Sequence, residues 1–402
     1  MSEIAPASID LPRGSAVRFI VLLGVADLFA DMTYESARSV TGPYLGVLGA
    51  SAAIVGVVAG FGEFLGYALR LISGYISDRI GGYWLITIIG YSINLFAVPL
   101  LALTGRWELA AVLIVAERAG RAIRVPARDA MLSHAGSQTG LGWGFGLHGA
   151  LDSAGGILGP LIVGTALYLK GGYQGAFALL AIPAVLAITV LFAARHFYPR
   201  PRDLDMAPPN LTPGHFSRRF WVYVAAAALI AAGYADFPLI AFHFGKTGLI
   251  APVWIPVLYS LAMAAEAMAA IVLGRLFDRI GIGAMILATC ASALSAPLAF
   301  LGGPAAAATG MVTWGIGIGA QASVMRAAIA PLAPASQRGT AYGIFNAAYG
   351  LAWFAGSSLL GELYDSCVPA LAAVSVLLQG AAVALLWRVS WSPPERPATG
   401  SA

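Results

Sequence analysis

A long apolar segment near the start of the chain carries acids, a tyrosine and an arginine at helical spacing. Asp27, Asp31, Tyr34 and Arg38 fall within about 60° of arc at 100° per residue, with Glu35 at the edge of this stripe. Carboxylates one helical turn apart disfavour double ionisation, so one of them can hold a proton near neutral pH. Such a stripe can take up and release protons or bind a polar solute.

Further charges recur inside the other apolar segments. Glu63, Tyr67 and Arg70 follow one another at i, i+4 and i+7 in the second segment. The remaining charges and histidines within apolar segments are Glu117, Arg118, Arg121, Arg124, Arg128, His148, Asp152, Asp236, His243 and Glu266. A charge at bilayer depth costs roughly 2.5–3.5 kcal/mol even on the lenient insertion scale, so these side chains must face protein or water.

The charges either neutralise one another as structural pairs or line a water-filled cavity that contains a titratable carboxylate. A tightly paired cluster is a costly way to hold helices together, which favours the cavity. For proton coupling we expect Asp31 and Glu63 to change protonation, with Arg118 as the positive neighbour that tunes them. The candidates for substrate contact are Asp27, Tyr34, Glu35, Arg38, Tyr67, Asp152, Asp236, Glu266, Trp314, Asn346 and Trp353.

The elements that must position these residues are membrane-spanning helices. Of the 402 residues, 59% are hydrophobic and only 10% are charged, against about 25% in soluble proteins, so lipid must solvate the apolar surface. Apolar runs of about 20 residues match the thickness of the hydrocarbon core. They predict twelve spans, at 17–47, 51–75, 83–104, 107–129, 141–169, 173–195, 218–245, 251–276, 283–302, 305–329, 340–364 and 366–389.

The spans divide into two groups of six around a proline-rich linker. The predicted parts are a tail at 1–16, a bundle at 17–195, the linker at 196–217, a bundle at 218–389 and a tail at 390–402. Most arginines that flank the spans lie on the side of the termini, and the other side keeps only Arg106, Lys170 and Lys246. The positive-inside rule therefore places both termini in the cytoplasm of a cell with this protein in its inner (plasma) membrane. The first residues lack the basic region and cleavage site of a signal peptide, so we expect the first helix to be retained.

A short motif occurs twice, 200 residues apart. Gly74-Tyr75-Ile76-Ser77-Asp78-Arg79-Ile80-Gly81 follows the second predicted span, and Gly274-Arg275-Leu276-Phe277-Asp278-Arg279-Ile280-Gly281 follows the eighth. A loop that repeats at this interval indicates two parallel six-helix repeats, an arrangement known among secondary transporters.

These two segments resemble the signature loop of the major facilitator superfamily. Arg118-Ala119-Gly120-Arg121, followed by Pro126, resembles its fourth-helix motif, and the run from Gly155 to Pro160 resembles a fifth-helix motif that is commoner in exporters working as antiporters. The resemblance covers about residues 18–390. It implies an all-α membrane protein with twelve transmembrane helices in two pseudo-symmetric six-helix bundles.

The resemblance also implies roles for the motif residues. Gating at the cytoplasmic ends of the helices is expected of Gly74, Asp78, Arg79, Gly274, Asp278 and Arg279. In such a gate a carboxylate can meet a helix N-terminus. Close helix packing is expected of Gly155, Gly159 and Pro160, because small residues four apart let helix backbones approach.

The predicted function is secondary active transport by alternating access, with proton-coupled efflux of a cationic or zwitterionic compound. The alternative is a proton-coupled symporter, or a uniporter, that imports an organic anion through Arg38 and Arg118. A membrane-embedded transferase is disfavoured, because Asp27 and Asp31 do not form the aspartate-rich segments that hold magnesium and diphosphate. We therefore do not expect an enzyme.

The expected partners are a small-molecule substrate, protons as the coupling ion and the lipid bilayer, and we expect a monomer. The net charge of +4 is explained by topology, so no nucleic acid is expected to bind. Two lone cysteines, Cys290 and Cys367, make neither a disulfide framework nor a zinc site. No cofactor or metal is therefore predicted.

Overall fold

The computed structural model describes residues 13–80, 82–139, 141–199, 216–329, 332–333 and 338–391. The first half contains α1 (Arg13–Val47), α2 (Ala52–Ile80), α3 (Tyr83–Leu100), the 3-10 helix η1 (Leu101–Leu103), α4 (Trp107–Thr139), α5 (Leu141–Tyr168), α6 (Gly172–Leu179) and α7 (Ala181–Phe197). The second half contains α8 (Arg218–Gly233), α9 (Phe237–Thr247), α10 (Trp254–Ile280), α11 (Gly283–Ala293), α12 (Ser295–Leu301), α13 (Pro304–Ala322), α14 (Val324–Ala327), α15 (Arg338–Ser366) and α16 (Val368–Trp391).

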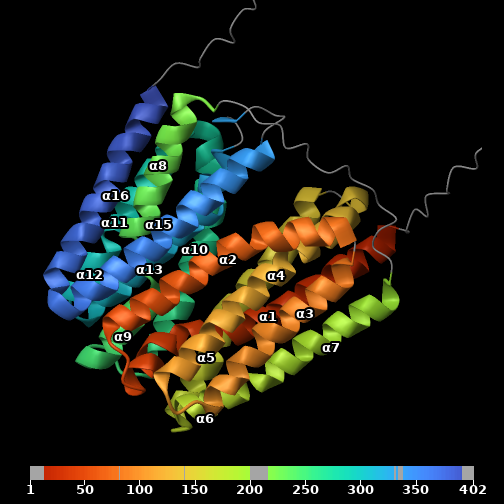
Figure 1. The fold of residues 1–402 in the computed structure, drawn as a ribbon, viewed down its shortest axis with the longest axis horizontal. Coiled ribbons are helices and arrows are strands. Elements are labelled where there is room, and N and C mark those ends of the chain that lie inside the picture. The colour runs from red at the N-terminus through yellow and green to blue at the C-terminus, as the bar shows by residue number, and fades with distance from the viewer. Residues whose placement is uncertain are drawn as a thin grey trace, which may run out of the picture.

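Within the described residues the fold is all-α, and its helices form twelve segments in two six-helix bundles, which confirms the predicted fold class (Figure 1). Several segments are broken: α3 continues as η1, and the pairs α6–α7, α8–α9, α11–α12 and α13–α14 each form one segment. Eight segments are apolar and long enough to cross a membrane by length and composition alone. Among the other segments, α1 and α4 carry the densest sets of charges, which lowers their hydropathy.

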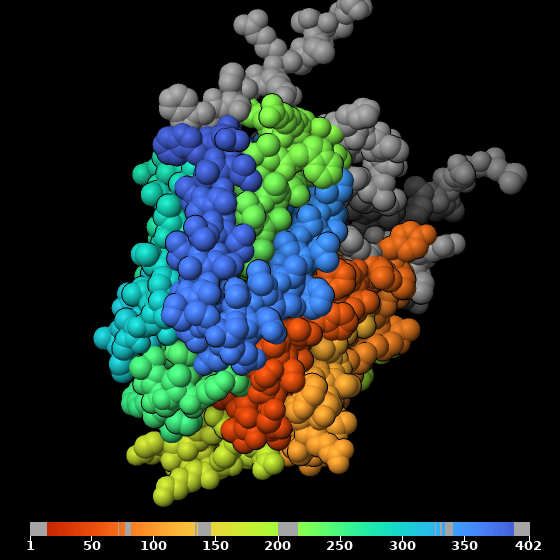
Figure 2. All heavy atoms as spheres, turned by 60° about the vertical axis from the view of Figure 1, so that its left-hand side comes forward, coloured from red at the N-terminus to blue at the C-terminus, as the bar shows by residue number. Residues whose placement is uncertain are grey.

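Each half is held together by long helix contacts. In the first half α1 packs on α5 and α7, and α4 packs on α2 and α3. In the second half α10 packs on α13, and α8 packs on α15 and α16. The two halves meet through three helix pairs, α1–α9, α2–α15 and α5–α10. Figure 2 shows α15 (blue) side by side with α2 (orange-red).

The halves approach most closely at the end of the bundle opposite the start of α1 and the end of α16, named the distal end here. A Cβ on Gly42 of α1 would lie 1.8 Å from the carbonyl oxygen of Pro238 on α9. A Cβ on Gly56 of α2 would lie 2.3 Å from the carbonyl oxygen of Ser357 on α15. These distances are below any van der Waals contact, so only glycine lets the backbones cross here, and the distal end is closed.

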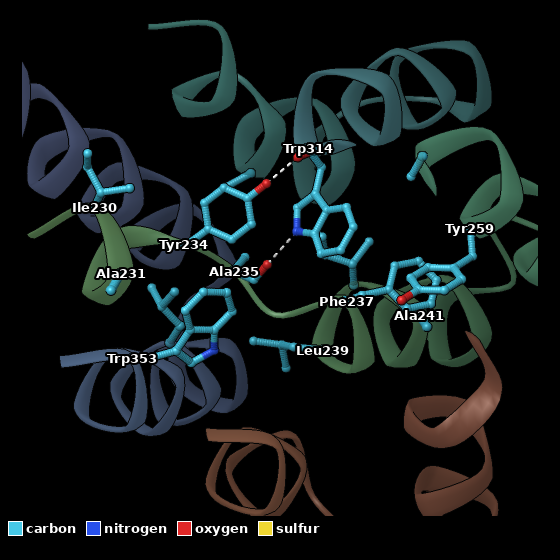
Figure 3. Packing of buried hydrophobic residues seen from close by; sticks show 14 of the residues in the cluster. Ile230, Ala231, Tyr234, Ala235, Phe237, Leu239, Ala241, Tyr259, Trp314 and Trp353 are labelled. Carbon is cyan, nitrogen blue, oxygen red and sulfur yellow. Dashed lines mark hydrogen bonds between the residues drawn. The ribbon is translucent and has the colours of Figure 1, made fainter. Parts of the chain in front are cut away.

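The seventh segment is broken where it passes between the halves. Pro238 lacks a backbone N–H and its ring clashes with the carbonyl four residues earlier, so α8 ends at Gly233 and α9 begins at Phe237. The carbonyls released by the break are bonded by side chains: Trp314 Nε1 donates to Ala235 O at 2.9 Å, and Ser375 Oγ donates to Gly233 O at 2.6 Å. Figure 3 shows the Trp314 indole pointing at this carbonyl. Irregular backbone at membrane depth is therefore satisfied within the protein.

Candidate functional site

A central cavity of about 170 Å³ lies between the two halves, on the inner side of the distal contacts. It is lined by Glu35, Arg38, Glu63, Tyr67, Arg70, Arg121, Tyr259, Met263, Glu266, Trp314, Ile318, Gln321, Ala322, Met325, Phe345, Asn346, Tyr349 and Trp353. Three arginines and three glutamates are among these residues, so the lining is close to neutral. Eight predicted substrate or proton residues line this cavity, namely Glu35, Arg38, Glu63, Tyr67, Glu266, Trp314, Asn346 and Trp353.

A chain of ion pairs runs along the first-half wall and crosses to the second half. Glu63 Oε1 lies 2.8 Å from Arg118 Nη1 and 3.3 Å from Arg38 Nη2. Arg38 also pairs with Asp236 at 3.3 Å, and Trp353 Nε1 donates to the other oxygen of Asp236 at 3.0 Å. Asp236 and Arg118 are buried beside the cavity, behind the residues that line it. The chain ties α1 to both the second helix and the broken seventh segment.

A second polar group on α1 also crosses between the halves. Glu35 accepts a hydrogen bond from the hydroxyl of Tyr259 on α10. On its other side Glu35 Oε1 lies 3.8 Å from Arg121 Nη1, which is a loose ion pair. The Arg121 guanidinium lies 4.2 Å from the centroid of the Tyr34 ring, and its side chain is 25% exposed. Arg121 is therefore held in place by the ring while its charge stays accessible from the cavity.

The second-half wall is mainly aromatic. Trp314, Tyr349 and Trp353 line it from α13 and α15, and Tyr259 continues it on α10; Figure 3 shows Trp314, Trp353 and Tyr259. Glu266 is the one acid that this half contributes to the lining among the described residues. It lies within electrostatic range of Glu35 and Arg38 across the cavity, yet forms no ion pair with any residue that the structure describes. The two walls thus differ in kind, and Glu266 carries an unpaired carboxyl.

Asp27 lies elsewhere, at the centre of a fully buried ionic cluster within the first half. Its Oδ1 accepts hydrogen bonds from Tyr91 and Arg124, and its Oδ2 accepts from Arg128 at 2.5 Å. His148 Nε2 lies 2.9 Å from the same Oδ2. The Asp27 side chain has no exposed surface and does not line the cavity, so this arrangement holds α1, α3, α4 and α5 together.

Three more predicted residues lie between this cluster and the cavity. Asp31 is buried, and its Oδ1, 4.0 Å from Arg124 Nη2, accepts no hydrogen bond from the described residues. Tyr34 is buried beneath Arg121. Asp152 on α5 is half-buried and interacts electrostatically with Asp31. The predicted approach of a carboxylate to Arg118 is thus made by Glu63, while Asp31 lies nearest Arg124.

The predicted gating and packing residues fall at helix ends and crossings. The side chains of Asp78 and Arg79 lie outside the described residues; Gly74 faces Pro126, which a Cβ would meet at 3.6 Å. Asp278 and Arg279 are exposed in the last turn of α10, and Gly274 has no atom within 4 Å of an added Cβ.

The fifth-helix motif lies where α5 crosses α1. A Cβ on Gly155 would lie 2.3 Å from the Leu28 carbonyl oxygen, and one on Gly159 would lie 2.6 Å from Met32. Pro160 is buried in the same helix. Both glycines are therefore required for the close approach of these two backbones.

Some cavity residues were missing from the sequence prediction. Tyr259, Met263 and Glu266 stand at i, i+4 and i+7 on α10, and only Glu266 was chosen because it is charged. The same spacing rule that selected residues on α1 identifies the other two once Glu266 is known to face the cavity. Gln321 had no such signal; its Oε1 accepts a hydrogen bond from Tyr349. Among the described residues no group of three or more His, Cys, Asp or Glu side chains is arranged to hold a metal ion.

Two helical bundles around a polar cavity that is closed at one end define a secondary membrane transporter. The chain belongs to the major facilitator superfamily, whose family model matches residues 24–357. It is 38% identical over 385 residues to an uncharacterised protein of Mycobacterium tuberculosis, covering 94% of each chain.

Solved transporters share the fold at low sequence identity. A bacterial homologue of the human lysosomal transporter Spinster, in an inward-facing and unoccupied conformation, superposes with a TM-score of 0.74 at 15% identity, over 95% of this chain and 100% of that one. The nucleoside transporter NupG superposes with a TM-score of 0.73 at 14% identity, over 93% of this chain and 100% of that one.

Proposed function

We propose that the protein is a proton-coupled exporter of a small zwitterionic solute, with both termini in the cytoplasm and the distal end facing outward. The observation that carries this proposal is the unpaired Glu266, which stands opposite the arginines of the first-half wall. The balance of three arginines and three glutamates in the lining favours a solute of no net charge over a bare cation or anion.

Each end of a zwitterion has a matching group in the cavity. Arg121 is accessible and only loosely paired, so it can take the carboxylate of the solute through two parallel N–H donors. Glu266 can take the ammonium group, and the aromatic wall around Trp314 can cover the apolar part. Binding to both walls at once also draws the two halves together, which is what alternating access requires.

Exchange of solute for protons needs a carboxyl that holds one or the other. Glu63 and Asp236 already face arginines at 2.8–3.3 Å, so their negative charge is in use. Glu266 has no such partner among the described residues, so a bound ammonium group and a bound proton compete for it directly. Asp31, with an oxygen that lacks a described hydrogen-bond donor, is the proposed place from which the proton continues through the first half.

Purified protein in liposomes tests the proposal. A thermal-shift screen against zwitterionic, cationic and anionic solutes first finds a solute that binds, and its flux is then measured together with that of protons. We expect uphill solute efflux driven by a proton gradient in the wild type. Glu266→Gln should weaken solute binding at least tenfold and remove its dependence on pH, whereas Asp129→Asn, an exposed acid outside the cavity, should behave as wild type.

Two outcomes contradict the proposal. Solute flux without any proton movement identifies a uniporter. Binding of anionic solutes only, with Glu266→Gln unaffected, points instead to the import of an organic anion through Arg38 and Arg118.

A further inference from the structure

The first turn of α2 at the distal end is capped by a side chain from the other half. Asp365, at the end of α15, accepts hydrogen bonds from Ala53 N at 2.9 Å and from Ala52 N at 3.4 Å. The next free donor, Ile54 N, lies 3.3 Å from Ser51 Oγ of its own helix. The exposed N–H groups of this helix start are thus shared between a local residue and Asp365, and the latter contact is named the Asp365 cap here.

The Asp365 cap depends on the closed distal end. Directly below it a Cβ on Gly361 of α15 would lie 2.7 Å from Ala52 O, and one on Gly56 of α2 would lie 2.3 Å from Ser357 O. The carboxylate reaches α2 because these two backbones touch. Any movement that opens the distal end must separate α2 from α15 and therefore break the Asp365 cap.

From this geometry we propose that Asp365 is a gating residue of the transport cycle, which stabilises the state closed at the distal end. A carboxylate at a helix N-terminus is favourable because it faces unsatisfied N–H groups and the positive end of the helix dipole. A contact that exists in one of two conformations shifts the equilibrium by its own free energy. For an exposed charge at a helix end, this amounts to about a three- to tenfold change in the ratio of the two states.

The surroundings make the Asp365 cap reversible. A second cavity of about 530 Å³ lies at the distal end, and Asp365, Lys246, Phe242 and Ser51 are among its lining residues. Lys246 Nζ stands 3.9 Å from the Asp365 carboxylate, on the same half as Asp365. When α2 moves away, water and Lys246 can therefore take over the carboxylate, so that no charge is left bare.

The pseudo-symmetric crossing of α5 and α10 lacks this device. Thr165 stands 200 residues before Asp365 and carries no charge, and the cap residue of α10, Val253, has no capping side chain. Conformational control at the distal end is thus placed on one of two related crossings. The same helix α2 carries the signature Asp78 in its last turn, so acidic residues are associated with both of its ends.

A cysteine reporter at the crossing tests the proposal without any solute. Ser357 is 1% exposed between α2 and α15, and its Oγ has no described hydrogen-bond partner, so Ser357→Cys fits and becomes reactive only when the crossing opens. The native cysteines are replaced by Cys290→Ser and Cys367→Ser. The rate of maleimide labelling is then measured on purified full-length protein in lipid nanodiscs.

We expect Asp365→Ala to raise the labelling rate about three- to tenfold, since the open state becomes more populated. Asp365→Asn keeps an acceptor oxygen and loses the charge, so its rate should fall between those of Asp365→Ala and the wild type. Glu362→Gln, an exposed acid one turn earlier on α15, is the matched control and should leave the rate unchanged.

Unchanged or slower labelling in folded Asp365→Ala overturns the proposal. If Asp365→Ala does not yield a monodisperse protein, the comparison of Asp365→Asn with Glu362→Gln decides, and equal rates for these two overturn it as well. Because the assay uses neither solute nor proton gradient, its result is independent of the proposed substrate and coupling ion.

Discussion

Replacing Asp27 tests whether the buried cluster of the first half is structural. In Asp27→Asn the negative charge disappears, while Arg124 and Arg128 remain buried against the same oxygen positions. Removing one partner of a buried pair leaves an uncompensated charge and costs about 3–5 kcal/mol. At roughly 2–4 °C per kcal/mol for a unit of this size, the melting temperature should fall by about 6–20 °C.

Asp129→Asn is the matched control, because Asp129 pairs with the same Arg128 at 2.7 Å but its side chain is 41% exposed. An exposed pair contributes only about 0.2–1 kcal/mol, so the melting temperature should change by less than about 4 °C. Both variants are compared with the wild type by thermal melting in one detergent. Solute affinity, measured on the folded protein, should be unchanged in Asp27→Asn, because Asp27 does not line the cavity.

Equal melting temperatures for the two variants would refute the reasoning, since burial would then make no difference to the pair. A loss of solute affinity at an unchanged melting temperature would return Asp27 to the substrate-binding residues, where its place in the helix stripe had put it. The two readouts therefore separate a structural role from a binding role.

Three further outcomes are expected. Gly42→Ala brings a Cβ to 1.8 Å from a backbone oxygen of α9, so the Ser357→Cys reporter should label several times faster, whereas Gly66→Ala, with no atom within 4 Å, should not change the rate; equal rates would contradict the closed crossing. Asp31→Asn should abolish proton-driven uphill transport in liposomes and spare downhill exchange, and persistence of the wild-type proton-to-solute ratio would exclude Asp31 from the proton route. Asp278→Asn should slow transport at least twofold with solute affinity retained, and the reverse pattern would place Asp278 in the binding site.

The fold could be predicted because its cause is local. A run of about 20 apolar residues is long enough to cross the bilayer whatever its neighbours are, and the repeated loop relates the halves directly. The helices nevertheless run past the apolar runs, and α4 continues to Thr139 where hydropathy ended the span at 129. Polar helix ends outside the hydrocarbon core have no hydropathy signal. The break before Pro238 was also readable in principle, because proline disrupts the turn that precedes it.

The site could be predicted only in part, because a helical arc identifies a face and not its partner. Asp27 and Asp31 share one stripe, but Asp27 meets two arginines of α4 closely while Asp31 stays 4.0 Å from one of them. That difference depends on the rotation and crossing of α1 against α4 and α5, which backbone contacts at glycines such as Gly155 determine. Asp365 escaped notice for the same reason: its partner is a backbone 313 residues away.

The Asp27 cluster also has a consequence for how the protein enters the membrane during its synthesis. Arg124 and Arg128, which neutralise Asp27, follow it by 97 and 101 residues. At about 5–20 residues per second, the ribosome delivers them roughly 5–20 s after Asp27 has emerged. Until then α1 carries a carboxyl that hydrocarbon cannot solvate and that no arginine has reached. Stable insertion of the first helix therefore waits for the fourth, and the early helices of the nascent chain settle into lipid as a group.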